Sequence, residues 1–225
     1  MAKSALGNHE ILLASASPRR RQLLRSAGVE PRVRPVDVPE PVLPKETGEE
    51  MVRRLAQEKA QAALVAHPDA DLILAADTTV LFRGEVLGKP ANAEAAVEML
   101  MSLPQDSHRV ITAITLVGAG RKERLTAATK TDLFMRPYNR AEVERYAAGG
   151  SPLDKAGGYG IQDEDFMPVD MGRFQGCFTN VMGLPLCTLG RMLETWGYEG
   201  TDQLIDACFE YHRHELQPIG DLENA

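Results

Sequence analysis

Short apolar segments alternate along the chain with amphipathic ones, a pattern that predicts β-strands alternating with helices. The apolar run that leads up to Asp77 is continuous, as in a central strand that is buried on both faces and ends at this residue. Other predicted strands are Ile11–Ala14, Arg32–Val38, a hairpin that turns at residues 83–85, and two long antiparallel strands within residues 109–135 that join around residues 118–120. Because no internal repeat interrupts this alternation, we expect an α/β fold built on a mixed sheet.

Each predicted helix begins at a residue that favours a helix start. Ser17 precedes Pro18, and this pair is typical because Ser accepts from free backbone N–H groups and Pro suits the first helical position. That helix is expected to end at Gly28. Thr47 and Glu50 have the spacing of a capping box, which predicts a second, longer helix. Further helices are expected from Asn92 to about Leu103, from Asn139 to Gly149, from Pro185 to about Trp196 and from Thr201 to about His214, with an irregular glycine-rich stretch at residues 151–183.

The composition excludes several broad function classes. The chain carries a net charge of -7 over 225 residues, whereas general nucleic-acid or membrane-surface binding needs clustered positive charge. An anionic ligand must therefore be met by basic residues placed locally. No apolar run approaches the roughly 20 residues of a membrane span, and no secretion signal is recognisable. The three cysteines form no C-x-x-C pair, so we expect a reduced cytoplasmic protein without structural zinc.

One candidate site follows the first predicted strand, in "ASASPRRRQLL" at residues 14–24. A strand that leads through a tight loop into a capped helix leaves free backbone N–H groups at the helix N-terminus, which favours anion binding. Ser15 and Ser17 add hydroxyl donors, and Arg19 and Arg20 add forked positive charge that suits phosphate oxygens. A capped surface helix with solvated arginines has the same pattern, so the segment alone leaves both interpretations open.

Asp77 is the second candidate, because open α/β sheets bind ligands beyond the carboxyl ends of their strands. A carboxylate there can bind a divalent cation or accept a proton from water, and it can equally be a turn residue. Thr78 follows it and can hydrogen-bond a ligand or the loop itself. Glu40, after the second predicted strand, can join Asp77 at a metal or remain a solvated loop carboxylate.

Two lysines and a glycine-rich segment complete the set of candidates. Lys59 lies in a predicted helix, and Lys89 is held extended by the proline that follows it; each alone can be a surface lysine. In "PLDKAGGYGIQ", residues 152–162, the glycines permit close approach of a flat ligand, and Gln162 can hydrogen-bond the edge of a base. A glycine-rich surface loop is the alternative interpretation.

Together these segments resemble the Maf family of nucleoside triphosphate pyrophosphatases. The resemblance runs from about Ile11 to Leu193, and its motifs occur in family order: "LLASASPRRRQLL", "LAQEKA", "AADTTV", "GEVLGKP", "HRVITA", "PLDKAGGYGIQ" and "NVMGLPL". It implies a Maf/ITPase-like fold, an elongated mixed β-sheet flanked by helices, with two lobes around a cleft. It also implies hydrolysis of a nucleotide between its α- and β-phosphates, a housecleaning role, and a possible homodimer.

Matched position by position, the resemblance implies a role for each candidate. Asp77 takes the role of proton acceptor that activates water, and Glu40 joins it at a divalent metal cation, Mg²⁺ or Mn²⁺. The implied substrate-binding residues are Ser15, Ser17, Arg19, Arg20, Lys59, Thr78, Lys89 and Gln162. Of these, Arg19, Thr78 and Gln162 resemble the subgroup that acts on dTTP and UTP.

The chain departs from the family pattern in two places. After "GIQ" it reads "DEDFMPVDMGRFQGCFTNV", with extra acidic residues and with residues 176–178 where the family has a Gly-Ser-Tyr-like step. Residues from about 197 to 225 also extend beyond the family's usual end. We expect residues 1–225 to form one Maf-like domain that includes this C-terminal extension.

The residues and the resemblance together favour a nucleoside triphosphate pyrophosphatase that acts on dTTP and UTP, with no nucleic-acid polymer or membrane as partner. One alternative is a nucleotide-binding regulator of septum formation and cell division with little turnover. A nucleotidyltransferase also uses basic loops and paired carboxylates. It should carry a glycine-rich loop directly after its first strand, however, and "ASASPRR" contains no glycine.

Overall fold

A computed structural model describes residues 9–118 and 124–213 of the chain. Within them, six strands form one sheet in the order β2-β1-β3-β5-β6, with β4 paired to β3. The strands are β1 (Ile11–Leu13), β2 (Arg32–Val33), β3 (Leu72–Phe82), β4 (Glu85–Leu87), β5 (Ser107–Gly118) and β6 (Arg124–Phe134). β1 runs parallel to β2 and β3, whereas β4, β5 and β6 pair antiparallel to their neighbours. The expected mixed sheet is therefore confirmed.

Two strands differ in length from their predictions. β2 has only two residues instead of the seven expected, and its pairing with β1 stops before Pro35, which has no N–H group to donate. β3 does not end at Asp77, because the antiparallel partner β5 pairs with it as far as Leu81. Asp77 therefore lies in the middle of a strand, opposite Ala113, and the prediction that it stands at a carboxyl end is wrong.

The two faces of β3 present different residues to the site. Ile73 and Ala75 pack toward α2 (Gly48–Ala66), whereas Leu74 and Ala76 pack into the core on the opposite face. Because successive side chains of a strand alternate, Asp77 faces α2 and Thr78 faces the other side. Parallel pairing of β1 stops at Leu13, so the edge of β3 next to Asp77 is left without a neighbouring strand on that side.

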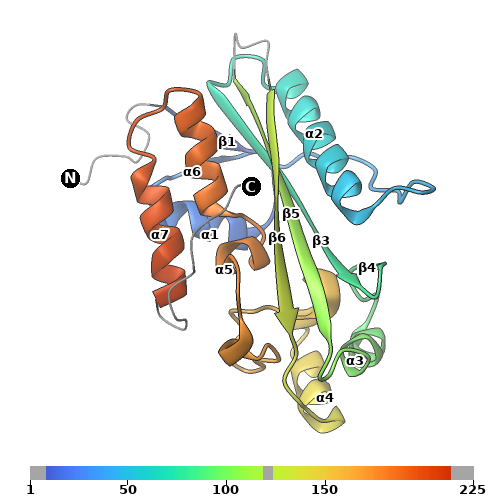
Figure 1. Ribbon diagram of the computed structural model, residues 1–225. Coiled ribbons are helices and arrows are strands. Elements are labelled where there is room, and N and C mark those ends of the chain that lie inside the picture. Colours follow the sequence, from blue (N-terminus) through green and yellow to red (C-terminus); the bar gives the residue numbers. More distant parts are fainter. Residues whose placement is uncertain (1–8, 119–123, 214–225) are drawn as a thin grey trace.

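Helices cover both faces of the sheet (Figure 1). α2 crosses one face, and its predicted capping box is present at Thr47 and Glu50. The other face is covered by α1 (Pro18–Ser26), α5 (Phe178–Val181), α6 (Leu186–Thr195) and α7 (Asp202–Arg213). Ser17 caps α1 as expected. Of the described residues, none lies in a helix with the length and apolar character that a membrane span requires.

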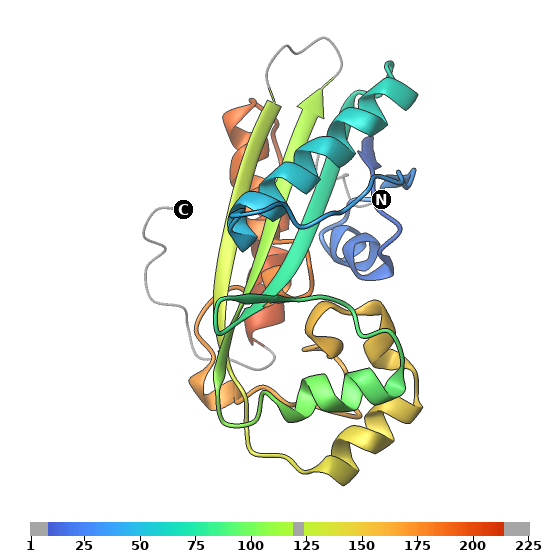
Figure 2. The same ribbon diagram turned by 90° about the vertical axis from the view of Figure 1, so that its right-hand side faces the viewer.

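A smaller part of the protein lies at one end of the sheet (Figure 2). It contains α3 (Ala93–Met101) and α4 (Arg140–Ala148), which begin at the predicted capping residues Asn92 and Asn139. The stretch predicted to be irregular, residues 151–183, contributes three short 3-10 turns as well as α5: Ser151–Asp154, Ala156–Gly158 and Met171–Arg173. The predicted turn around residues 118–120 lies largely outside the described residues, as does His214.

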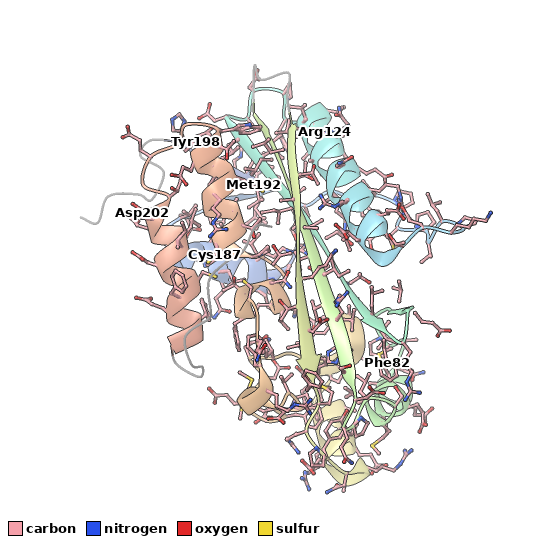
Figure 3. All side chains as sticks on the ribbon, in the orientation of Figure 1. Phe82, Arg124, Cys187, Met192, Tyr198 and Asp202 are labelled. Carbon is pink, nitrogen blue, oxygen red and sulfur yellow. The ribbon has the colours of Figure 1, made fainter. Side chains whose placement is uncertain are left out.

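The three cysteines come together where α5, α6 and α7 meet. The Sγ atoms of Cys177 and Cys208 are 3.7 Å apart, and Cys187 lies in the first turn of α6 (Figure 3). The neighbouring Cys208 thiol and burial raise the pKa of both Cys177 and Cys187, so these two remain protonated thiols at neutral pH. α7 is thereby packed against the segment that leads into α5.

Candidate active site

A cavity of about 390 Å³ opens beside the middle of β3, where β1 has ended. Its walls come from the loop between β1 and α1, from α2, from β3 and from residues 154–162. All ten residues singled out in the sequence line this one cavity: Ser15, Ser17, Arg19, Arg20, Glu40, Lys59, Asp77, Thr78, Lys89 and Gln162. Both the large and the small part of the protein contribute to it.

The loop after β1 is ordered by its own hydroxyl groups. Ser17 Oγ accepts from the backbone N–H of Arg20 at 3.5 Å, and the backbone N–H of Ser17 donates to Ser15 Oγ at 3.3 Å. Pro18 occupies the first position of α1, where a missing N–H group costs nothing. The positive end of the helix dipole and both hydroxyl groups thus face the same cavity.

Arg20 joins three segments around the cavity. Its guanidinium donates to Ser15 Oγ at 2.9 Å, to Thr78 Oγ1 at 3.0 Å and to the carbonyl oxygen of Gly183 at 2.8 Å. Burial lowers the pKa of Arg20, and the nearby Asp77 carboxylate acts in the opposite direction. An arginine remains charged at neutral pH even so. Arg20 is therefore a fixed positive charge in the cavity wall.

Two carboxylates converge on Lys59, which reaches the cavity from α2. The Nζ atom of Lys59 lies 2.6 Å from Asp77 Oδ1 and 2.6 Å from Glu40 Oε1. The side chains of Lys59 and Asp77 are only 12% and 10% exposed. Burial raises the pKa of Asp77, and the positive charges of Lys59 and Arg20 limit the rise. The result is a mostly buried carboxylate that is more basic than an ordinary aspartate.

The glycine-rich segment forms the opposite wall. Gly157 and Gly158 adopt φ angles of 77° and 74°, a region that favours glycine, and a Cβ on Gly157 would lie 3.1 Å from the Val80 side chain. The backbone N–H of Gly157 donates to the carbonyl oxygen of Gly88 at 3.1 Å. This bond holds the loop that carries Lys89 against the segment, so Lys89 also lines the cavity.

Some residues that shape the site had little or no local signal in the sequence. Arg19 forms an ion pair with Asp154, 135 positions away, at 2.7 Å between Nη1 and Oδ2. Gln162 Nε2 donates to Asp163 Oδ1 at 2.8 Å. Asp154 was recognisable as a polar neighbour of the glycines, but its pairing with Arg19 depends on the fold. Asp163 begins the acidic departure that follows "GIQ", but nothing in the local pattern indicates its contact with Gln162.

The carboxylates provide a limited set of metal ligands. Among residues 9–118 and 124–213, no group of three or more His, Cys, Asp or Glu side chains is arranged to hold a metal ion. Asp77 and Glu40 nevertheless converge on one position of positive charge, the ammonium of Lys59. Their oxygen atoms are the hard ligands that Mg²⁺ and Mn²⁺ prefer.

The fold and the cavity define an α/β protein whose mixed sheet carries a pocket with fixed cations on its walls and two convergent carboxylates. The Maf-like protein family matches residues 10–196 of the chain, and the chain belongs to this family. All ten residues of the candidate site lie within the matched segment, whereas α7 lies beyond it.

Two relatives whose names state an activity each cover more than four fifths of the chain. A dTTP/UTP pyrophosphatase of Salinibacter ruber is 46% identical over 185 residues, which are 81% of this chain and 89% of that protein. A dTTP/UTP pyrophosphatase of Geobacter metallireducens is 42% identical over 190 residues, 84% of this chain and 97% of that protein. Among solved structures, the Ham1 protein of Staphylococcus aureus aligns with a TM-score of 0.41 and 20% identity over 56% of this chain and 71% of that one, too distant to carry an inference.

Proposed function

We propose that this chain hydrolyses dTTP and UTP between the α- and β-phosphates and releases a nucleoside monophosphate and pyrophosphate. The observation that carries the proposal is the position of Asp77, a buried carboxylate beside a cavity whose walls hold Arg20, Lys59 and Lys89. The activity named for the relatives supports the same reaction and favours it over a regulator with little turnover. Such a reaction belongs in the cytoplasm, where nucleoside triphosphates are made and used.

The triphosphate is proposed to lie along the positively charged walls. Ser15, Ser17 and the first turn of α1 offer hydrogen-bond donors from one side. Arg20, which is already held by three partners, adds a charge that needs no rearrangement. Pre-arranged donors stabilise negative charge that develops on phosphate oxygens, and this is the main catalytic requirement of phosphoryl transfer.

Asp77 is proposed to accept the proton of the attacking water. The water oxygen forms a bond to the α-phosphorus, the bond from that phosphorus to the bridging oxygen breaks, and pyrophosphate leaves with the electron pair. The water proton passes to Asp77 and from there to solvent. Because burial raises the pKa of Asp77, its carboxylate is a better base than an exposed aspartate at neutral pH.

A divalent cation fits this arrangement. Asp77 and Glu40 would hold it, and phosphate oxygens would complete its shell, as Mg²⁺ commonly binds through one or two carboxylates and substrate phosphates. When bound, the cation supplies neutralisation of phosphate charge. Lys59 lies against the same two carboxylates and balances their charge within the protein itself.

Arg19 is proposed to contribute both charge and substrate choice. We expect Arg19→Ala to remove about 2 kcal/mol of transition-state stabilisation, because a charge-assisted contact is lost. kcat/KM for dTTP and UTP should therefore fall about thirtyfold. The measurement is pyrophosphate release at several substrate concentrations. Arg21→Ala is the matched control, since Arg21 is exposed and lies 3.6 Å from the exposed Glu30. Equal activity of the two variants would make Arg19 an ordinary surface arginine.

The proposed function is tested with the purified full-length chain, Mg²⁺ or Mn²⁺, and a panel of canonical and modified nucleoside triphosphates. Pyrophosphate and the monophosphate should appear in equal amounts, with dTTP and UTP as the best canonical substrates. Release of inorganic phosphate and a diphosphate would contradict cleavage between the α- and β-phosphates. Tight nucleotide binding without any product would instead favour the regulator of cell division.

A further inference from the structure

An ordered hydrogen-bond network lies directly behind Gln162. The carboxylate of Asp163 accepts from Gln162 Nε2 through Oδ1 at 2.8 Å. Its other oxygen, Oδ2, accepts from Tyr146 Oη at 2.6 Å and from Ser151 Oγ at 2.8 Å, with Lys155 Nζ at 3.4 Å. The Asp163 side chain is only 16% exposed. Four donors from separate positions therefore fix this carboxylate in place.

A carboxylate in this position determines which way the neighbouring amide is turned. An ionised carboxylate can only accept hydrogen bonds, so the nitrogen end of the Gln162 amide must face Asp163. A half-turn of the amide would bring Oε1 against Oδ1, two acceptors in contact, and is disfavoured. The oxygen Oε1 and the second N–H of Gln162 are left for other partners, and Gln162 lines the cavity.

The backbone at Gly160 lies close to the hydrogen-bonded side chains of Gln162 and Asp163. A Cβ added to Gly160 would lie 2.5 Å from Asp163 Oδ1 and 2.6 Å from Gln162 Nε2, so any larger residue there would displace the ends of these two side chains. The backbone N–H of Gly160 also donates to Tyr146 Oη at 3.1 Å. Tyr146 thus contacts both the glycine and the carboxylate, and the pair is held from two sides.

We propose that Asp163 is a positioning residue that locks the Gln162 amide with its oxygen toward the base, so that the site selects pyrimidines that carry an N3–H group. Uracil and thymine offer an N3–H donor beside a carbonyl acceptor, which matches an amide oxygen beside an amide N–H. Cytosine has an unprotonated N3, an acceptor that faces the amide oxygen unfavourably unless the amide turns over. The inference rests on the proposed function for the identity of the bound nucleotides.

The test compares Asp163→Asn with wild type on UTP and CTP. The new amide can donate or accept, so it permits both orientations of Gln162. We expect wild type to prefer UTP, and the UTP/CTP ratio of kcat/KM to fall about tenfold in the variant, within the range of one bidentate amide–base pair. The change should appear in KM, while kcat for UTP stays close to wild type, because Asp163 touches no reacting atom. If Asp163 had only a structural role, kcat/KM would fall by the same factor for UTP and for CTP.

Two further variants keep the test decisive. Asp165→Asn removes the same charge at an exposed position two residues further along and should leave the ratio unchanged. Tyr146→Phe removes one donor to Asp163 and should shift the ratio in the same direction by a smaller factor, which gives a second measurement if Asp163→Asn folds poorly. Thermal unfolding of each variant establishes that the proteins compared are folded.

Binding measurements distinguish the role of Asp163 from the proposed hydrolysis. Equilibrium Kd values for UTP and CTP, measured with non-hydrolysable α,β-imido analogues, report the base preference without turnover. A wild type that prefers the UTP analogue but releases no pyrophosphate would overturn the proposed function and leave the role of Asp163 standing. A wild type without preference, or an unchanged ratio in both network variants, would overturn the role of Asp163.

Discussion

Asp77→Asn is expected to abolish pyrophosphate release from dTTP and UTP while the protein stays folded. Asparagine has nearly the same shape, and it can still accept a hydrogen bond from Lys59. It cannot take a proton from water at neutral pH, so the loss of general-base catalysis alone should lower kcat by about 10²–10⁴-fold. The measurement is pyrophosphate release, with thermal unfolding as the check on folding.

The pH dependence supplies a second readout of the same residue. Asp77 must be ionised to act as a base, and burial raises its pKa. As the pH falls through that raised pKa, the carboxylate is protonated and kcat/KM of the wild type should decline. The residual activity of the variant should lack this acidic limb. Near-normal turnover in Asp77→Asn, or an unchanged acidic limb, would refute the role of Asp77 as base.

Lys59→Met should both weaken catalysis and destabilise the protein. Methionine is similar in length but carries no charge, so Asp77 and Glu40 are left beside each other without the ammonium that contacts both at 2.6 Å. Removing one partner of a mostly buried ion pair costs about 3 kcal/mol or more, although the exposure of Glu40 screens part of this. The free energy of unfolding at neutral pH measures the loss.

Divalent cations provide the distinguishing measurement for this variant. In Lys59→Met no ammonium lies between Asp77 and Glu40, so the two carboxylates are free to bind a cation. Mn²⁺ without nucleotide should therefore raise Tm more in the variant than in wild type. Lys130→Met is the matched control, because the pair of Lys130 with Glu49 is more exposed than that of Lys59 with Asp77 and its loss should cost about 0–1 kcal/mol. If Mn²⁺ stabilises both variants equally, the two carboxylates do not form the metal site.

The features that the sequence predicts well are those encoded by neighbouring residues. Ser17, Asn92, Asn139 and the Thr47–Glu50 pair mark helix starts, because a cap acts within one turn of the chain. The presence of a mixed sheet also follows from the order of apolar segments. The lengths of β2 and β3 do not, because pairing with strands that come later or earlier in the chain decides where each strand ends.

In the candidate site, too, local sequence predicts the residues themselves but not their distant partners. Nine of its ten residues lie in short motifs and Glu40 follows a predicted strand, so local pattern together with the family resemblance is enough to select them. Their partners were not predictable in this way. Gly183 receives the Arg20 guanidinium from 163 positions away, and Asp154 receives Arg19 from 135. Asp163 accepts from Tyr146, a residue of α4 that lies 17 positions earlier, and only the folded chain creates this pairing.

The place of Asp77 inside β3 has a consequence for how substrate range can change. Asp77 lies in a strand that pairs with β5 both before and after this residue. A paired strand holds a side chain in place more accurately than a loop does. Residues 154–162, which contribute another wall of the cavity, lie in turns and irregular backbone, where substitutions are more easily accommodated. The proposed general base, Asp77, and the proposed base-contacting residue Gln162 therefore lie in parts of the protein that differ in rigidity. A designer seeking activity on a different nucleobase would vary the turns around Gln162 first and leave Asp77 untouched.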